Sequence, residues 1–115
     1  MTIWERVKSA LSSLPIPVVE SVYIPTSGGN YPDAFIVYFM VSAPPDQHAD
    51  NIETLTEYLV QVSYYDKAGL VNMPDIDGLM KTAGFTAGNR VEIPYNQTTR
   101  HFGLAMEFSY LEERI

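Results

Sequence analysis

The sequence of 115 residues contains no cysteine, and its basic residues are few. Without cysteine, the chain has no disulfide framework, no thiolate zinc site and no thiol catalysis. Seven Lys and Arg residues stand against fourteen Asp and Glu residues, which gives a formal net charge of −7. Because phosphate contacts need clustered basic side chains, this composition argues against tight nucleic-acid binding.

Long apolar stretches are also missing. The longest, residues 34–41, falls far short of the roughly 20 residues that a membrane helix needs. Glu5, Arg6 and Lys8 interrupt the apolar residues at the N-terminus, unlike the core of a signal peptide. We therefore expect no membrane association. The length and the 46% hydrophobic content predict a single globular domain over residues 1–115.

Two helices are expected. Thr2 and Glu5 have the spacing of a capping box, and apolar residues then recur at helical intervals, which predicts a helix over residues 2–13. A second helix is predicted over residues 72–83, with Asn72 as N-cap and Gly84 just past its end. Phe85 would then contact Met80, as in a Schellman motif. Trp4 is interpreted as a core anchor or an edge of the helix packing.

Five strands complete the predicted order α-β-β-β-α-β-β. They are expected at residues 18–24, 34–43, 58–65, 89–93 and 100–111. The fold class is α+β, with a five-stranded, mostly antiparallel sheet and two helices packed on one face. The last strand alternates cleanly, so Phe108 should face the core, whereas His101 and Glu107 should face away. Pro94 marks the fourth strand as an edge strand or as its end.

No motif in the chain is a catalytic signature. His48 lies between Asp46 and Asp50, where a weak cation site is conceivable but a solvated polar loop is favoured. A relay of Thr99, His101 and Glu107 would lack a nucleophile elbow, so we interpret His101 as a cross-strand partner of a polar residue. We expect no metal and no cofactor.

Aromatic residues are plentiful, with eight tyrosines and five phenylalanines. A single layer of two helices cannot cover both faces of a five-stranded sheet. The remaining face, which bears Leu59 and Tyr65, is either covered by another subunit or solvated as an ordinary half-polar surface. The sequence leaves both alternatives open.

The whole chain resembles a family of small phage proteins. The matching segments are DAFIVYF at 33–39, HADN at 48–51, EYLVQVSYYDK at 57–67, LMKTAGF at 79–85 and RHFGLAMEFSY at 100–110. This pattern, together with the N-terminal helix that ends at prolines, is similar to the tail terminator (tail completion) and head–tail joining proteins of long-tailed bacteriophages. The Gly- and Pro-containing segment 26–33 departs from it.

The resemblance implies a structural assembly protein of the virion or prophage, and no enzyme. Identical subunits, commonly six, would form a ring that caps the tail tube and docks on the head connector, in the host cytoplasm during assembly and then in the virion. Candidate interface residues are Asp46, His48, Asp50, Asn51, Tyr31 and Tyr65. The alternatives are a head-side joining or minor capsid protein and, in another class, a ligand-binding module or enzyme that uses the His101 region.

Overall fold

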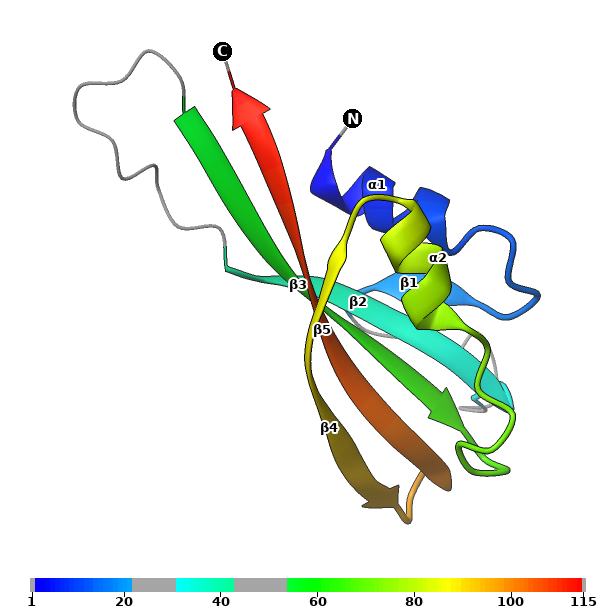
Figure 1. The fold of residues 1–115 in the computed structure, drawn as a ribbon. Coiled ribbons are helices and arrows are strands. Elements are labelled where there is room, and N and C mark those ends of the chain that lie inside the picture. The colour runs from blue at the N-terminus through cyan, green and yellow to red at the C-terminus, as the bar shows by residue number, and fades with distance from the viewer. Residues whose placement is uncertain (1, 22–30, 43–53, 115) are drawn as a thin grey trace.

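Two short helices and five strands follow one another in the predicted order (Figure 1). This computed structural model describes residues 2–21, 31–42 and 54–114. The helices are α1 (Ile3–Ala10) and α2 (Ile76–Thr82). The strands are β1 (Val18–Glu20), β2 (Ala34–Ser42), β3 (Thr54–Asp66), β4 (Thr86–Asn96) and β5 (His101–Arg114). The α+β class is confirmed.

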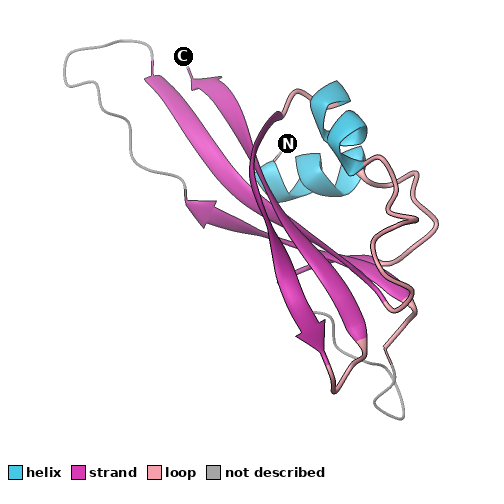
Figure 2. Ribbon diagram, turned by 60° about the horizontal axis from the view of Figure 1, so that its bottom comes forward, coloured by secondary structure: helices cyan, strands magenta, loops and turns pink. Residues whose placement is uncertain are grey.

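The strands form one sheet in the order β1-β2-β3-β5-β4. Strand β1 runs parallel to β2, with Val19 opposite Val37, and the other neighbouring strands are antiparallel. The last strand of the chain therefore lies inside the sheet, between β3 and β4. Both helices pack on the same face of the sheet, as predicted (Figure 2). None of the helices in the described ranges is long and apolar enough to cross a membrane.

Helix α1 begins with the predicted capping box. The Thr2 amide donates to the Glu5 carboxylate at 2.7 Å, and the Glu5 amide donates to the Thr2 hydroxyl at 3.1 Å. The helix ends at Ala10, earlier than predicted, because residues 11–14 form a tighter turn in which the Leu14 amide donates to the Leu11 carbonyl. Trp4 is 37% exposed, so it lies at the edge of the packing and is not a core anchor.

Helix α2 begins at Ile76, and the prediction of Asn72 as its N-cap is wrong. Asp75 is the N-cap, and its carboxylate accepts from the Gly78 amide at 3.0 Å. Pro74 explains the shift, because proline disfavours helical geometry at the residue before it. The predicted C-terminal motif is confirmed. The Phe85 amide donates to the Met80 carbonyl, and Gly84 has a φ of 98°.

Several strands differ in length from their predictions. Strand β4 continues through Pro94, which costs no ladder bond because β4 is an edge strand. Strand β3 begins four residues earlier than predicted. Strand β1 ends at Glu20, since Ser21 has a φ of 71° and leaves the extended region; residues 22–24 of the predicted strand lie outside the described residues.

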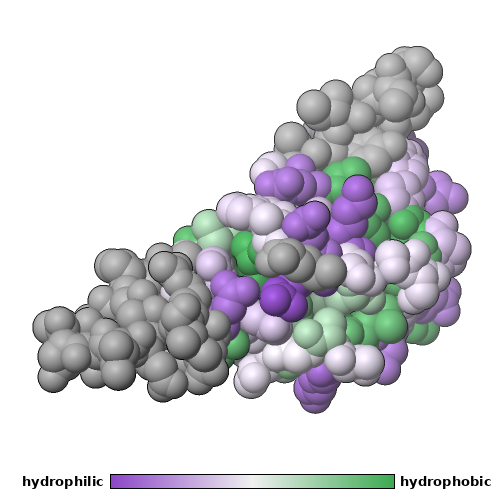
Figure 3. All heavy atoms as spheres, turned by 90° about the horizontal axis from the view of Figure 1, so that it is seen from above, coloured by the Kyte–Doolittle hydropathy of each residue, from purple (hydrophilic) through white to green (hydrophobic). Residues whose placement is uncertain are grey.

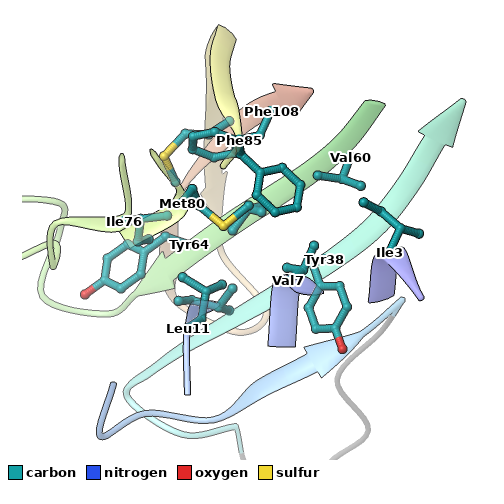
Figure 4. Close-up of a cluster of buried hydrophobic side chains, with 13 residues drawn as sticks. Ile3, Val7, Leu11, Tyr38, Val60, Tyr64, Ile76, Met80, Phe85 and Phe108 are labelled. Atoms are coloured by element: carbon teal, nitrogen blue, oxygen red, sulfur yellow. The ribbon is translucent and has the colours of Figure 1, made fainter. Parts of the chain in front are cut away.

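The main core lies between the helices and the sheet (Figure 4). The helices contribute Ile3, Val7 and Leu11 from α1 and the α1–β1 turn, and Ile76 and Met80 from α2. The sheet contributes Ile36, Tyr38, Val60, Val62, Tyr64, Met106 and Phe108, and Phe85 closes the cluster. Phe108 is fully buried, whereas Glu107 lies on the other face, which confirms the predicted register of the last strand.

Candidate interaction site

The face of the sheet away from α1 and α2, here called the helix-free face, is built from alternate residues of each strand. Cross-strand pairing arranges them in rows. One row runs from Phe35 through Tyr65 and Gly103 to Ile93, and the next from Val37 through Ser63 and Ala105 to Val91. The first row begins with two aromatic residues, and the middle of the second row consists of two small residues. This face therefore has its own packing, separate from the main core.

Four rings gather at the end of the helix-free face near the start of β2. Phe35 stacks on Tyr65 with ring centroids 4.9 Å apart, and Tyr31 stacks on Phe35 at 5.8 Å. The His101 ring meets Phe35 edge-on at 5.0 Å. Aromatic pairs in these geometries add stability beyond the area that they bury. Tyr31 and Tyr65, two of the six predicted interface residues, are therefore brought close together.

Glycine at position 103 makes this arrangement possible. A Cβ atom there would lie 3.0 Å from Cδ1 of Tyr65 and 3.1 Å from Cβ and Cδ1 of Ile93. The two neighbouring side chains thus close over the bare backbone of β5. This role of Gly103 was not predicted from the sequence. The only signal was a lone glycine in an otherwise regular strand, which often marks a close approach.

His101 is buried in this cluster, and its chemistry is constrained. Its Nε2 lies 2.8 Å from the carbonyl oxygen of Pro32. A carbonyl only accepts, so Nε2 carries the proton and donates it. The other nitrogen, Nδ1, is buried and has no hydrogen-bond partner within the described residues. The ring therefore fastens the segment before β2 to the sheet.

This placement corrects the sequence interpretation of His101. Its partner is a backbone carbonyl outside the sheet, and not a polar side chain on a neighbouring strand. Glu107 lies six residues farther along β5, about 20 Å away at the usual rise of a strand. A relay from His101 to Glu107 is therefore not assembled, and Nε2, which donates to Pro32, cannot act as a base.

A cavity of about 270 Å³ opens beside the ring cluster. It is lined by Ser21, Tyr31, Phe35, Val37, Tyr65, Ile93, Pro94, Asn96, Thr99 and His101. Most of this lining is apolar or aromatic, with hydroxyl and amide groups among it. The remaining predicted interface residues, Asp46, His48, Asp50 and Asn51, lie outside the described residues, as does the candidate cation site around His48.

Beyond the cavity, the helix-free face exposes large apolar side chains. Phe39 is 37% exposed, Leu111 59% and Val91 65%. Phe39 and Leu111 alternate with Tyr38 and Tyr110, which belong to or pack against the main core, whereas Val91 lies on the edge strand between the exposed Arg90 and Glu92. Leu59 is half-buried between them. This part of the sheet is therefore neither polar nor covered within the part of the chain that the structure describes.

The far end of the sheet is a two-stranded arm, which we define as residues 54–58 of β3 paired with residues 110–114 of β5. Strand β2 stops opposite Leu59 and β4 starts opposite Ser109, so no other described strand flanks the arm (Figure 1). At its base, the guanidinium of Arg6 lies 4.6 Å from the centroid of Tyr110 and 3.5 Å from the Glu112 carboxylate. These contacts tie α1 to the arm.

The end of the molecule at which both termini lie has a mixed surface. Seen from that end, apolar and polar residues alternate over the described surface, without one large apolar area (Figure 3).

Within residues 2–21, 31–42 and 54–114, no three His, Asp or Glu side chains converge in a way that would hold a metal ion.

Comparisons with known proteins found little. No family model matches the chain, and no curated protein matches it. Among solved structures, the fold is similar to the sheath/tube terminator, in its extended state, of an extracellular contractile injection system designated PVC. The TM-score is 0.44 and the sequence identity is 9%, over 97% of this chain. The chain spans 57% of the length of that protein.

Proposed function

We propose that this chain is a structural subunit of a phage tail or a related particle, and that it acts as a tail terminator. In this proposal, identical copies close into a ring, six in the commonest arrangement, which caps the tail tube and faces the head connector. The protein has no catalytic role. It acts in the host cytoplasm during assembly and afterwards as part of the particle.

The observation that carries the proposal is the helix-free face. Its exposed apolar side chains sit on a sheet that is already well packed on its other side, so they are not needed for the main core. Exposed apolar groups on a rigid sheet are typical of surfaces that bind another protein. A head-to-tail ring needs two different surfaces on each subunit. The helix-free face and the arm are two such surfaces.

The acidic charge fits the same role. A net charge of −7 gives the chain a negative potential, which disfavours tight association with a nucleic acid. A ring around a channel through which DNA passes gains from that repulsion. The same property suits a head-side joining protein, which stays the alternative within this class.

Native mass spectrometry and electron microscopy of the purified chain test the proposal. We expect closed oligomers, and rings with a central opening. Val91→Asp places a charge on the helix-free face and should abolish them. Val71→Asp is the matched control, because Val71 is 92% exposed and lies outside the sheet. A chain that stays monomeric at millimolar concentration and does not bind isolated tail tubes of its own particle would overturn the proposal.

The His101 region was the basis of the alternative in another class, a ligand-binding module or enzyme. The geometry gives His101 a structural role, since Nε2 is engaged by Pro32 and Nδ1 is sealed. These contacts favour the assembly role over catalysis at His101.

A further inference from the structure

The two ends of the helix-free face have complementary shapes. One end holds the cavity of about 270 Å³, with Phe35, Tyr65 and Ile93 in its lining. The other end is the arm, on which Leu111 projects from the same face and is 59% exposed. The cavity is much larger than the space that one water molecule occupies, and one aliphatic side chain fits it in size and chemistry.

The charges around these two features are complementary as well. Arg100 is exposed and stands between Thr99 and His101, which both line the cavity. Glu57 is exposed and lies directly across the arm from Leu111. Neither makes an ion pair with any other described residue. Lys67, Asp33 and Glu20, at the same end, are also exposed and carry charges of both signs, so the complementarity rests on Arg100 and Glu57.

The two features cannot meet within one molecule. Leu111 lies eight residues along β5 from Gly103, which forms the floor beneath Tyr65 and Ile93. At the usual rise of a strand this is about 26 Å. A contact between Leu111 and such a cavity therefore requires a second copy of the chain.

We propose that the arm of one copy docks on the helix-free face of the next, with Leu111 in the cavity and Glu57 facing Arg100. The occupant of the cavity is thus the same protein, and the complementary charges set the direction of docking. The contact joins different surfaces of the two copies, so its repetition generates a ring or a filament. This inference rests on the proposed assembly role and names the surfaces that would carry it.

Disulfide cross-linking can test this contact. The natural sequence contains no cysteine, so every disulfide must form between engineered cysteines. The full chain is prepared with Leu111→Cys and Ile93→Cys together, and oxidised at a concentration at which light scattering reports assembly. A disulfide requires Cα atoms within about 7 Å, so this pair can bond only between copies. Leu111→Cys with Lys81→Cys is the matched control, because Lys81 is exposed on α2, on the other face.

We expect a ladder of covalent oligomers from the first pair and little product from the control pair or from either single variant. Strong cross-linking of Leu111→Cys alone would show that arms meet each other, and would overturn the inference. Assembly of the wild-type chain without cross-linking of the first pair would overturn the inference and leave the assembly role standing. A monomeric wild-type chain without cross-links would overturn both.

Charge exchange gives a second, independent measurement. Glu57→Arg and Arg100→Glu should each lower the assembled fraction at least tenfold, and the double variant should recover most of it. Circular dichroism checks that each variant folds, which is expected because both side chains are exposed. Equal loss in the double variant and in the single variants would contradict the Glu57–Arg100 contact.

Discussion

The two faces of the sheet are made by the same strands and differ in almost every physical respect. On the face under α1 and α2, side chains from both helices and three strands form one buried cluster that includes Phe108, Val62 and Met80. On the helix-free face, packing is local: a ring cluster surrounds His101, and apolar side chains such as Phe39 remain partly exposed. The comparison indicates that one face supplies stability, which leaves the other available for contacts with other molecules.

The largest contrast is expected from the same substitution on the two faces. Phe108→Ala removes a fully buried ring and should lower the free energy of unfolding by about 3–5 kcal/mol. Phe39→Ala removes a ring that is 37% exposed and should cost about 1 kcal/mol. Urea denaturation of the monomeric protein measures both. Equal losses would mean that the two faces contribute equally to the free energy of unfolding, and would contradict the difference described above.

The next largest effect is expected from a polar contact on the face under α1 and α2. The hydroxyl of Tyr64 donates to the buried Asp66 carboxylate at 2.6 Å, and Asp66 also accepts from the Ala68 amide at 2.8 Å. Tyr64→Phe removes one donor from a buried carboxylate and should cost about 1.5–3 kcal/mol at pH 7. Urea denaturation measures the loss, and Tyr95→Phe, an exposed tyrosine, is the control.

The same pair predicts a pH dependence. Burial, followed by the hydrogen bond and the charge of Asp66, raises the pKa of Tyr64 well above its ordinary value. The folded protein therefore holds this proton more tightly than the unfolded chain, and the resulting stability is lost as the pH rises above about 10. Between pH 9 and pH 11 the wild type should lose stability more steeply than Tyr64→Phe. Parallel slopes would contradict this contribution.

Gly103→Ala tests the packing of the helix-free face. The new methyl group would meet Tyr65 and Ile93 at 3.0–3.1 Å, so both side chains must shift, at a cost of about 1–3 kcal/mol. The substitution should also distort the cavity beside Tyr65. Thermal and urea denaturation report the first effect, and the assembled fraction of the variant reports the second. A neutral result for both would show that this face is loosely packed.

The smallest effect is expected at an ion pair between α2 and β4. Arg90 donates to both carboxylate oxygens of Asp77, at 2.8 and 2.9 Å, and both side chains are more than a third exposed. The hydrogen bond from Arg90 lowers the pKa of Asp77. Asp77→Asn should therefore cost less than about 1 kcal/mol at pH 7 in low salt, and nothing measurable in high salt.

The lowered pKa of Asp77 also predicts how its contribution to stability changes with pH. A lowered carboxyl pKa contributes stability above the ordinary pKa of the group, and this contribution is lost as the pH falls through the lowered value. Asp77→Asn should thus be closest to the wild type in acid. Glu92→Gln is the control, since Glu92 is an exposed carboxylate on β4 without an ion pair among the described residues. A larger loss in the control would contradict the role of the Arg90 contact.

Local patterns predicted local structure well. The capping box at Thr2 and the Schellman motif at Gly84 depend only on neighbouring residues, and both are confirmed. Strand alternation likewise placed Phe108 on the correct face. The beginning of α2 was missed because Pro74 disfavours helical geometry at the residue before it, so the helix starts after Asp75 and not after Asn72.

Features that depend on contacts between distant residues could not be predicted from the sequence. The parallel pairing of β1 with β2 and the position of β5 inside the sheet follow from tertiary packing. Tyr31 and Tyr65 were named as interface candidates, but their assembly with His101 needs Pro32 and Gly103 in place. The interface role of Asp46, His48, Asp50 and Asn51 stays a prediction, because these residues lie outside the described ones.

The interior position of β5 has a consequence for synthesis on the ribosome. Thr54 pairs with Arg114, sixty residues later, so β3 keeps one edge without its partner until the last strand has emerged. An unpaired apolar strand is a template for aggregation, and such distant pairings close slowly. The nascent chain thus exposes one edge of β3 from the time that β3 is made until β5 follows, and a transcript cut short before β5 would yield an aggregating product rather than a smaller folded one.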